Sequence, residues 1–229
     1  MIFFDAAGTL IEVRGSVGEI YARLANQYGI SVDPADLQAG FVASFRRQPP
    51  MICPSDLTPP ERDKCERNWW RVLVREVFGK ASEHPRFEVF FETVFEYFAQ
   101  SEAWHVYPDV VPTLMALRRR GLRLAVISNF DSRLEGLLDR LALREHFESI
   151  HLSTHLGAAK PDPRIFHSAL KAHRVEASAA AHIGDSLRDD IEGARAAGIR
   201  AIWLDRNETS SQNEGLTRIT RLDQLLNLI

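Results

Sequence analysis

Five short apolar runs recur along the sequence, and each is followed by a polar or glycine-containing turn. They occupy residues 2–4, 122–127, 150–152, 180–183 and 201–204. Runs this short, apolar on both faces, are typical of strands buried inside a parallel sheet. Helix-patterned segments lie between the last four runs, and such strand–helix–strand repetition makes right-handed crossovers. The pattern therefore predicts an α/β fold with a Rossmann-like, doubly wound parallel sheet as its core.

The long segment between the first two runs follows a different pattern. Its apolar residues recur at helical spacing, and it contains no convincing strand. Proline pairs at residues 49–50 and 59–60 interrupt the helical pattern. The chain has 229 residues, which is long for one domain and short for two full ones. We therefore expect a core of residues 1–14 and 108–229, with an α-helical cap of residues 15–107 inserted into it.

Composition argues against two kinds of partner. The chain has 28 basic and 31 acidic residues and a net charge of −3, which disfavours nucleic-acid binding through bulk positive charge. No apolar stretch reaches the roughly 18 residues that a membrane span needs. The first residues also lack the basic region and cleavage site of a signal peptide. We therefore expect a cytoplasmic protein with no membrane partner.

Polar and charged side chains follow four of the five runs. In an open parallel sheet, ligands bind beyond the carboxyl ends of the strands. The residues that we expect at this edge are Asp5 with Thr9, Ser128 with Asn129, Lys160 at a helix start, and Asp185 with Asp189 and Asp190. The basic residues comprise 24 Arg and only 4 Lys, so a lysine beside a motif indicates a functional residue more than an ordinary surface cation. A carboxylate, a hydroxyl, an ammonium group and an acidic cluster are thus predicted to meet in one crevice.

These four motifs stand in the order and spacing of the haloacid dehalogenase-like hydrolase superfamily. They are Asp5-Ala-Ala-Gly-Thr-Leu, Ser128-Asn, Lys160-Pro and the stretch from Gly184-Asp to Asp190. The chain resembles the subgroup with a helical cap inserted after the first motif. Residues 121–131 and 160–166 look especially like the group of haloacid dehalogenase-like hydrolase domain-containing protein 3. The resemblance covers nearly the whole chain and implies Mg²⁺-dependent hydrolysis of a small phosphorylated metabolite.

The resemblance also implies a role for each motif residue. Asp5 is the implied nucleophile, since a carboxylate can attack phosphorus and form an aspartyl intermediate. Lys160 is implied to supply positive charge beside it. Thr9, Ser128, Asn129 and Lys160 are implied to bind the substrate phosphate, with backbone N–H groups near Asn129 helping at the helix start. From the residues alone, Ser128 is also open to a role as an ordinary helix N-cap.

A magnesium site is the second implication of the resemblance. Its implied ligands are Asp5, Asp185, Asp190 and the backbone carbonyl of Ala7, an oxygen-only set that suits Mg²⁺. The register counted back from Gly198 favours Asp190 over Asp189. An acid at a helix N-terminus, where it is favourable with the dipole, is the competing interpretation for Asp189.

Ala7 is a departure from the family pattern. The family's phosphatases usually carry an Asp at this position, which protonates the leaving group and then activates water. Loss of a positioned acid–base group typically costs on the order of 10²–10⁴ in rate. The leading interpretation is therefore a phosphohydrolase that is slow, uses good leaving groups or borrows a proton carrier from the cap.

Three alternatives stay open. Phosphonoacetaldehyde hydrolases also carry Ala in the first motif, but Lys64 and Lys80 do not fall where their cap lysine does. The 2-haloacid dehalogenases share Asp-Ala-x-Gly-Thr-Leu and use a cap Arg, for which Arg46 or Arg47 is available, but their fourth motif lacks the acid pair. The third alternative is a non-catalytic relative that binds a phosphate ligand, or a partner through its cap. The sequence leaves open whether the chain is a monomer or a homodimer.

Overall fold

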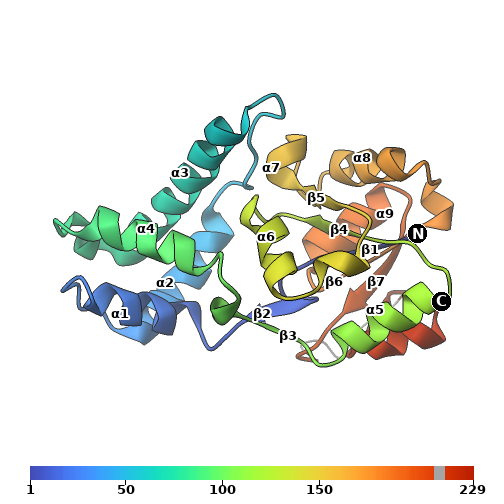
Figure 1. Ribbon diagram of the computed structural model, residues 1–229, viewed down its shortest axis with the longest axis horizontal. Helices are drawn as coiled ribbons and strands as arrows, with labels where there is room; N and C mark the ends of the chain where they lie inside the picture. Colours follow the sequence, from blue (N-terminus) through green and yellow to red (C-terminus); the bar gives the residue numbers. More distant parts are fainter. Residues whose placement is uncertain (209–214) are drawn as a thin grey trace. The chain divides into compact units, whose positions relative to one another are not determined.

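The computed structural model describes residues 1–208 and 215–229, and its chain divides into two compact units (Figure 1). Residues 1–12, 52–56 and 106–229 form one unit, which we call the core unit. Residues 13–51 and 57–105 form the other, which we call the helical unit. Within the described part of the chain, no helix combines the length and the apolar character that crossing a bilayer requires.

Parallel strands form the six-stranded sheet of the core unit, in the order β5–β4–β1–β6–β7–β8. They are β1 (Ile2–Phe4), β4 (Leu124–Ser128), β5 (Ile150–Leu152), β6 (Ala181–Gly184), β7 (Arg200–Leu204) and β8 (Thr217–Ile219). From β1 the chain winds outward in both directions, so the strand order reverses beside β1. Ligands bind at such a switch point in doubly wound sheets. Strand β8 lies outside the five predicted runs, because its only buried apolar side chain is Ile219.

Helices cover both faces of this sheet. On one face, α8 (Pro163–His173) and α9 (Gly193–Ala196) pack with Phe3 and Ile127 in one hydrophobic cluster. Figure 1 shows α5 (Val110–Arg119) on the opposite side of the sheet from α8. Two further helices, α6 (Arg133–Arg140) and α7 (Ser153–Leu156), follow β4 and β5. The predicted fold class, a Rossmann-like doubly wound sheet with inserted helices, is confirmed.

The helical unit contains α1 (Val17–Asn26), α2 (Pro34–Arg47), α3 (Pro59–Phe78) and α4 (Phe87–Tyr97). Local sequence sets where these helices begin. The Ser16 hydroxyl and the Glu19 side chain form a reciprocal capping box on α1, and the Asp33 side chain caps α2. Pro34 and Pro59 stand in the first turn, where no backbone N–H is needed. The second proline pair that interrupts the helical pattern therefore begins α3. Two short strands, β2 (Ile11–Val13) and β3 (Trp104–Val106), form a separate sheet.

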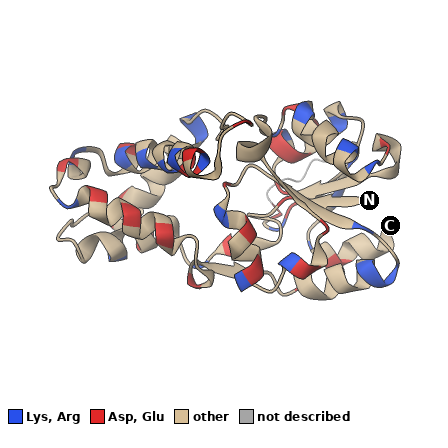
Figure 2. Ribbon diagram, turned by 45° about the horizontal axis from the view of Figure 1, so that its top comes forward, with Lys and Arg blue, Asp and Glu red and all other residues tan. Residues whose placement is uncertain are grey.

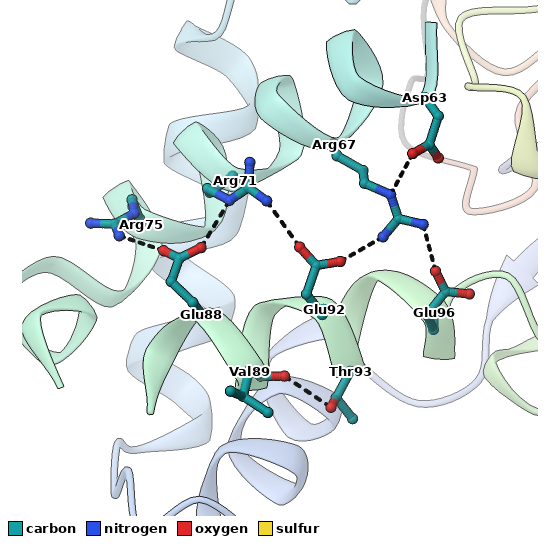
Figure 3. Close-up of polar contacts among 9 residues, drawn as sticks. All are labelled: Asp63, Arg67, Arg71, Arg75, Glu88, Val89, Glu92, Thr93 and Glu96. Carbon is teal, nitrogen blue, oxygen red and sulfur yellow. Dashed lines mark hydrogen bonds and ion pairs between the residues drawn. The ribbon is translucent and has the colours of Figure 1, made fainter. Parts of the chain in front are cut away.

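A ladder of ion pairs joins α3 to α4 (Figure 3). Arg67 and Arg71 both bind Glu92, at 2.6 and 2.9 Å. The same face of α3 carries cation–π contacts, in which the Arg67 and Arg71 guanidinium carbons lie 4.3 and 4.6 Å from the ring centroids of Phe95 and Phe91. The arginines therefore cover aromatic core residues while they balance the acidic side chains of α4. Figure 2 shows charges of both signs on both units.

Two buried histidines share a serine hydroxyl at the amino end of β5. Ser149 Oγ lies 2.8 Å from His151 Nε2 and 2.6 Å from His173 Nε2. The two imidazoles are 7% and 9% exposed, and their Nε2 atoms are 3.3 Å apart. Burial and the neighbouring His173 lower the pKa of His151 to about 4. This histidine is therefore neutral in the folded chain at neutral pH.

The His151 environment predicts an acid-sensitive fold. Because an unfolded histidine titrates near pH 6.5, the folded chain binds fewer protons than the unfolded chain between about pH 4 and 6.5. The free energy of unfolding should therefore fall by about 3 kcal/mol as the pH falls through this window. Urea unfolding of His151→Gln should show a flatter pH dependence, with His167→Gln, at an exposed position, as control. Equal slopes in wild type and His151→Gln would contradict this account.

Candidate active site

One buried ammonium group joins three segments of the core unit that are far apart in the sequence. Lys160 Nζ donates to Asp5 Oδ1 at 2.6 Å and to Asp190 Oδ1 at 2.5 Å. Asp5 directly follows β1, Lys160 precedes α8, and Asp190 lies in a π-helical turn at Leu187–Glu192, after β6. Lys160 and Asp190 are 3% and 1% exposed, so solvent screens their interaction little. These groups meet at the carboxyl edge of the sheet, where the sequence places them.

The carboxylate of Asp190 has three donors and a close-packed neighbour. Its Oδ1 also accepts a hydrogen bond from His182 Nε2 at 2.8 Å, and its Oδ2 accepts one from the Ser186 backbone N–H at 3.0 Å. Gly184, the last residue of β6, packs against it, since a Cβ there would lie 2.1 Å from Asp190 Cγ. Turns of π-helix occur frequently at functional sites. The structure therefore fixes both the position and the plane of this carboxylate.

Asp5, Asp185 and Asp190 form a carboxylate cluster in which the candidate ligand oxygens lie within 4.8 Å of one another. Asp185 follows β6, and its carboxylate lies against the loop after β1. Gly8 of that loop has a φ of +82°, and a Cβ at this position would lie 2.6 Å from Asp185 Oδ2. Glycine is therefore needed at residue 8 for its backbone conformation and for space. The oxygen-only donor set suits a hard divalent cation such as Mg²⁺.

Burial and charge shift the titration of these groups in different directions. Burial raises the pKa of Asp5, although the Lys160 ammonium opposes it. Loss of hydration, together with the charges of Asp5 and Asp190, raises the pKa of Asp185 to about 7. Burial acts on Asp190 too, but Lys160 and His182 outweigh it and lower the pKa of Asp190. Burial is likewise outweighed at Lys160, where the Asp190 and Asp5 carboxylates raise the pKa. Lys160 and Asp190 are therefore a charged pair.

The predicted phosphate-binding residues lie at the same edge of the sheet. Ser128 ends β4 and is buried, and its Oγ accepts a long hydrogen bond of 3.4 Å from the Phe130 N–H. Thr9 is also buried, with its Oγ1 3.4 Å from Asp185 Oδ1. The Asn129 side chain donates to the Lys160 carbonyl at 2.9 Å and accepts from the Lys160 N–H at 2.8 Å. This side chain therefore holds the Lys160 segment in place.

The structure distinguishes the two neighbouring acids of the fourth motif. The Asp190 carboxylate belongs to the cluster, whereas Asp189 is only half-buried and its backbone N–H donates to Ser186 Oγ at 3.1 Å. Burial raises the pKa of Asp189. Ala7, whose carbonyl is the fourth predicted metal ligand, is exposed in the loop after β1.

Two residues that contact the site, His182 and Arg206, are absent from the sequence-based prediction. Both have a signal in the sequence. His182 is a polar residue inside an otherwise apolar run, and Arg206 follows the fifth run, whose carboxyl end points to the same edge. Arg206 lies after the fifth run, whereas the predicted site residues follow the other four, and the apolar neighbours of His182 make its position look like core.

Arg206 fixes the loop that carries the first motif. Its guanidinium donates to the Thr9 carbonyl at 2.8 Å and binds both oxygens of Asp109, at 3.0 and 3.1 Å. It also lies over the Tyr107 ring, 3.8 Å from the centroid. The side chains of Arg206 and Asp109 are 12% and 4% exposed, so the pair is nearly buried. The loop between Asp5 and Leu10 therefore has an anchor on the segment after β7.

These contacts define the chemistry that the site can support. A buried carboxylate at the end of β1 faces a fixed ammonium group and a cluster of acids. Nucleophilic attack by Asp5 on an anionic centre needs positive charge nearby, and Lys160 provides it. The local geometry is thus suited to transfer of an anionic group to a carboxylate.

Comparison with known proteins gives a consistent result. A model of the haloacid dehalogenase-like hydrolase family matches residues 1–198. The chain is 38% identical over 206 residues to haloacid dehalogenase-like hydrolase domain-containing protein 3 of Homo sapiens, covering 89% of this chain and 81% of that protein.

Two further similarities are to proteins whose names describe an activity. The chain is 38% identical over 130 residues to a phosphoserine phosphatase of Thermus thermophilus, covering 56% of this chain and 50% of that protein. A crystal structure of a 2-haloacid dehalogenase from Pseudomonas syringae pv. Tomato DC3000 has a TM-score of 0.67 and 27% identity. That alignment covers 99% of this chain and 96% of the other.

The Arg206 contacts predict a stability effect. Arg206→Gln leaves a buried Asp109 without its cation, and breaking a buried pair in this way costs about 3–5 kcal/mol of unfolding free energy. Denaturant unfolding should show this loss. Arg221→Gln, which removes a cation whose side chain is 66% exposed, should cost less than about 1 kcal/mol. Equal effects of the two substitutions would show that Arg206 does not anchor the loop.

Proposed function

Because this chain belongs to the haloacid dehalogenase-like hydrolase family, we propose that it is a Mg²⁺-dependent hydrolase of a small phosphorylated substrate. The observation that carries the proposal is the Lys160 ammonium held between Asp5 and Asp190 at the carboxyl edge of the sheet. The similarity to a phosphoserine phosphatase over 130 residues supports a phosphate ester as the substrate.

Asp5 is the nucleophile in this proposal. One of its carboxylate oxygens attacks phosphorus, the bond from phosphorus to the leaving oxygen breaks, and an aspartyl phosphate forms on Asp5. Water then attacks the same phosphorus, the bond to Asp5 breaks, and inorganic phosphate leaves. Lys160 stays charged throughout and offsets the repulsion between the carboxylate and the phosphoryl group.

The carboxylate cluster fits the magnesium ion that the family implies. Asp5, Asp185 and Asp190 present oxygen ligands within 4.8 Å of one another, and we propose the Ala7 carbonyl as a further ligand. The three acids carry more negative charge than Lys160 neutralises, and burial, together with the charges of Asp5 and Asp190, raises the pKa of Asp185 to about 7. Bound Mg²⁺ supplies positive charge to the phosphoryl oxygens and favours the ionised carboxylates.

The phosphate-binding groups in this proposal are the Ser128 hydroxyl, the Thr9 hydroxyl and backbone N–H groups near Asn129. The Asn129 side chain acts on Lys160, because both of its polar atoms bind the Lys160 backbone. In this proposal Asn129 keeps the Lys160 ammonium beside Asp5. This positioning role is separate from the predicted contact with phosphate.

The alanine at position 7 determines the turnover rate that we expect for phosphate esters. A methyl group transfers no proton, so the leaving oxygen takes its proton from solvent or from the substrate itself. We therefore propose slow turnover of ordinary phosphate monoesters and faster turnover where the leaving group is a weak base.

A 2-haloacid dehalogenase is the second candidate. The first motif and the 27% identity to a 2-haloacid dehalogenase structure favour it. The combination of Asp185 and Asp190 with Lys160 favours the phosphohydrolase, because a cluster of acids suits a reaction that uses Mg²⁺. A non-catalytic phosphate-binding protein is the third candidate. An assay with several substrates distinguishes it from the two enzymes.

A panel assay tests the proposal. Purified protein with Mg²⁺ should release nitrophenol from p-nitrophenyl phosphate, and removal of the metal with a chelator should abolish release. Asp5→Asn should lower kcat by a factor on the order of 10³ or more. Asp223→Asn, an exposed carboxylate away from the site, should leave kcat unchanged. Metal-independent release of chloride from 2-chloropropionate would overturn the proposal, as would binding of phosphate without turnover of any substrate.

Restoring an acid at position 7 tests the role of Ala7. Ala7→Asp should raise kcat for an alkyl phosphate by about 10²-fold, because a positioned acid typically contributes 10²–10⁴. The gain should be smaller for p-nitrophenyl phosphate, whose leaving group needs little protonation. Ala7→Asn, which has nearly the same shape and no acid, should show no gain. An Ala7→Asp variant as slow as Ala7→Asn would show that the site is built around alanine.

A further inference from the structure

His182 has an unusual environment for a histidine. It lies on β6, paired with Phe3 of β1 and Ala201 of β7, and its side chain is 0% exposed. Its ring makes an edge contact with Phe166 of α8, with the centroids 5.1 Å apart. Polar residues are rarely placed at the centre of a sheet without a partner.

One nitrogen of this ring has a partner and the other does not. Nε2 lies 2.8 Å from Asp190 Oδ1, whereas Nδ1 is buried and has no hydrogen-bond partner among the described residues. Because Asp190 is a carboxylate, it only accepts hydrogen bonds, so Nε2 carries the proton. A buried polar atom without a partner is unfavourable, and the fold retains it.

We propose that His182 is a positioning residue that holds the Asp190 carboxylate, and through it the Lys160 ammonium, in place for attack by Asp5. The inference rests on the proposed function. Among the described groups that donate to Asp190, His182 belongs to a central strand, while Lys160 and Ser186 lie outside strands. Because the strand is rigid, the His182 N–H holds the Asp190 carboxylate in a fixed position.

The shared oxygen explains why a second donor matters. Asp190 Oδ1 accepts from both Lys160 and His182, at 2.5 and 2.8 Å. Without the His182 N–H, the carboxylate is free to turn about its remaining contacts, and Lys160 becomes its only donor at Oδ1. The ammonium is then drawn toward Asp190 and away from Asp5. Residues that orient groups of a metal site typically affect metal affinity or activity by 10–100-fold.

Two substitutions separate positioning from packing. His182→Leu removes the donor, and we expect kcat to fall about 10–100-fold with little change in KM, together with weaker Mg²⁺ binding in calorimetry. His182→Gln keeps an N–H at a similar reach and should recover most of both losses. His151→Leu, at another buried strand histidine, should lower stability while leaving kcat and Mg²⁺ affinity unchanged. Wild-type kcat and Mg²⁺ affinity in folded His182→Leu would overturn the inference, as would a Gln variant no better than Leu.

A spectroscopic measurement needs neither metal nor turnover. In ¹⁵N-histidine NMR of the metal-free protein, His182 should carry a proton on Nε2. Asp190→Ala should remove this preference, because no side-chain acceptor then faces Nε2. The opposite tautomer in wild type would overturn the inference. If wild type turns over no phosphate ester, the proposed function fails, while the tautomer and the Mg²⁺ titrations still decide the role of His182.

Discussion

The rest of the site depends on the contact of one buried ammonium group with two carboxylates. Lys160 Nζ lies 2.6 Å from Asp5 and 2.5 Å from Asp190, and almost no solvent reaches the contact with Asp190. A buried charge is costly unless it is paired and hydrogen-bonded, so none of the three side chains is stable there alone. The contact therefore requires that three segments far apart in the sequence lie next to one another at one edge of the sheet. The parallel order of β1, β5 and β6 makes this possible, since the three strands that precede these segments end at the same edge of the sheet.

Several local features serve this contact. Gly184 leaves room for the Asp190 carboxylate, and Gly8 leaves room for Asp185. Asn129 holds the backbone of Lys160 with both of its side-chain polar atoms. Arg206, which follows β7, anchors the loop after β1 through the Thr9 carbonyl. The site is thus held by backbone geometry as much as by charge, which is the preorganisation that electrostatic catalysis requires.

The sequence predicts the fold class and the main site residues for the same physical reason. Buried parallel strands are apolar on both faces, so they stand out as short runs, and functional residues follow them at the carboxyl edge. The motifs also predict the haloacid dehalogenase-like hydrolase family, which the family match confirms. The predicted group of haloacid dehalogenase-like hydrolase domain-containing protein 3 is confirmed by the 38% identity to the protein of that name from Homo sapiens. Strand β8 is not predictable in this way, because it is too short and too polar to form a run.

The contacts between side chains are the part that the sequence does not reveal. His182 looks like one polar residue in an apolar run, and only the packing of β6 against the turn at Leu187–Glu192 places it on Asp190. The Asn129 side chain has an amide of the right kind for phosphate, yet the fold directs it to the Lys160 backbone. Spacing identifies which residues reach an edge. It does not identify which of them the folded chain uses to hold the others.

The central claim is that the Asp5 carboxylate, held in place by Lys160, is the nucleophile that attacks phosphorus. The most direct measurement is to quench the protein during turnover of p-nitrophenyl phosphate with Mg²⁺ and to treat it with borohydride, which reduces an acyl phosphate to an alcohol. Peptide mass spectrometry should then find homoserine at position 5 and unmodified aspartate at positions 185 and 190. Homoserine at another position, or none while phosphate is released at the full rate, would contradict the account.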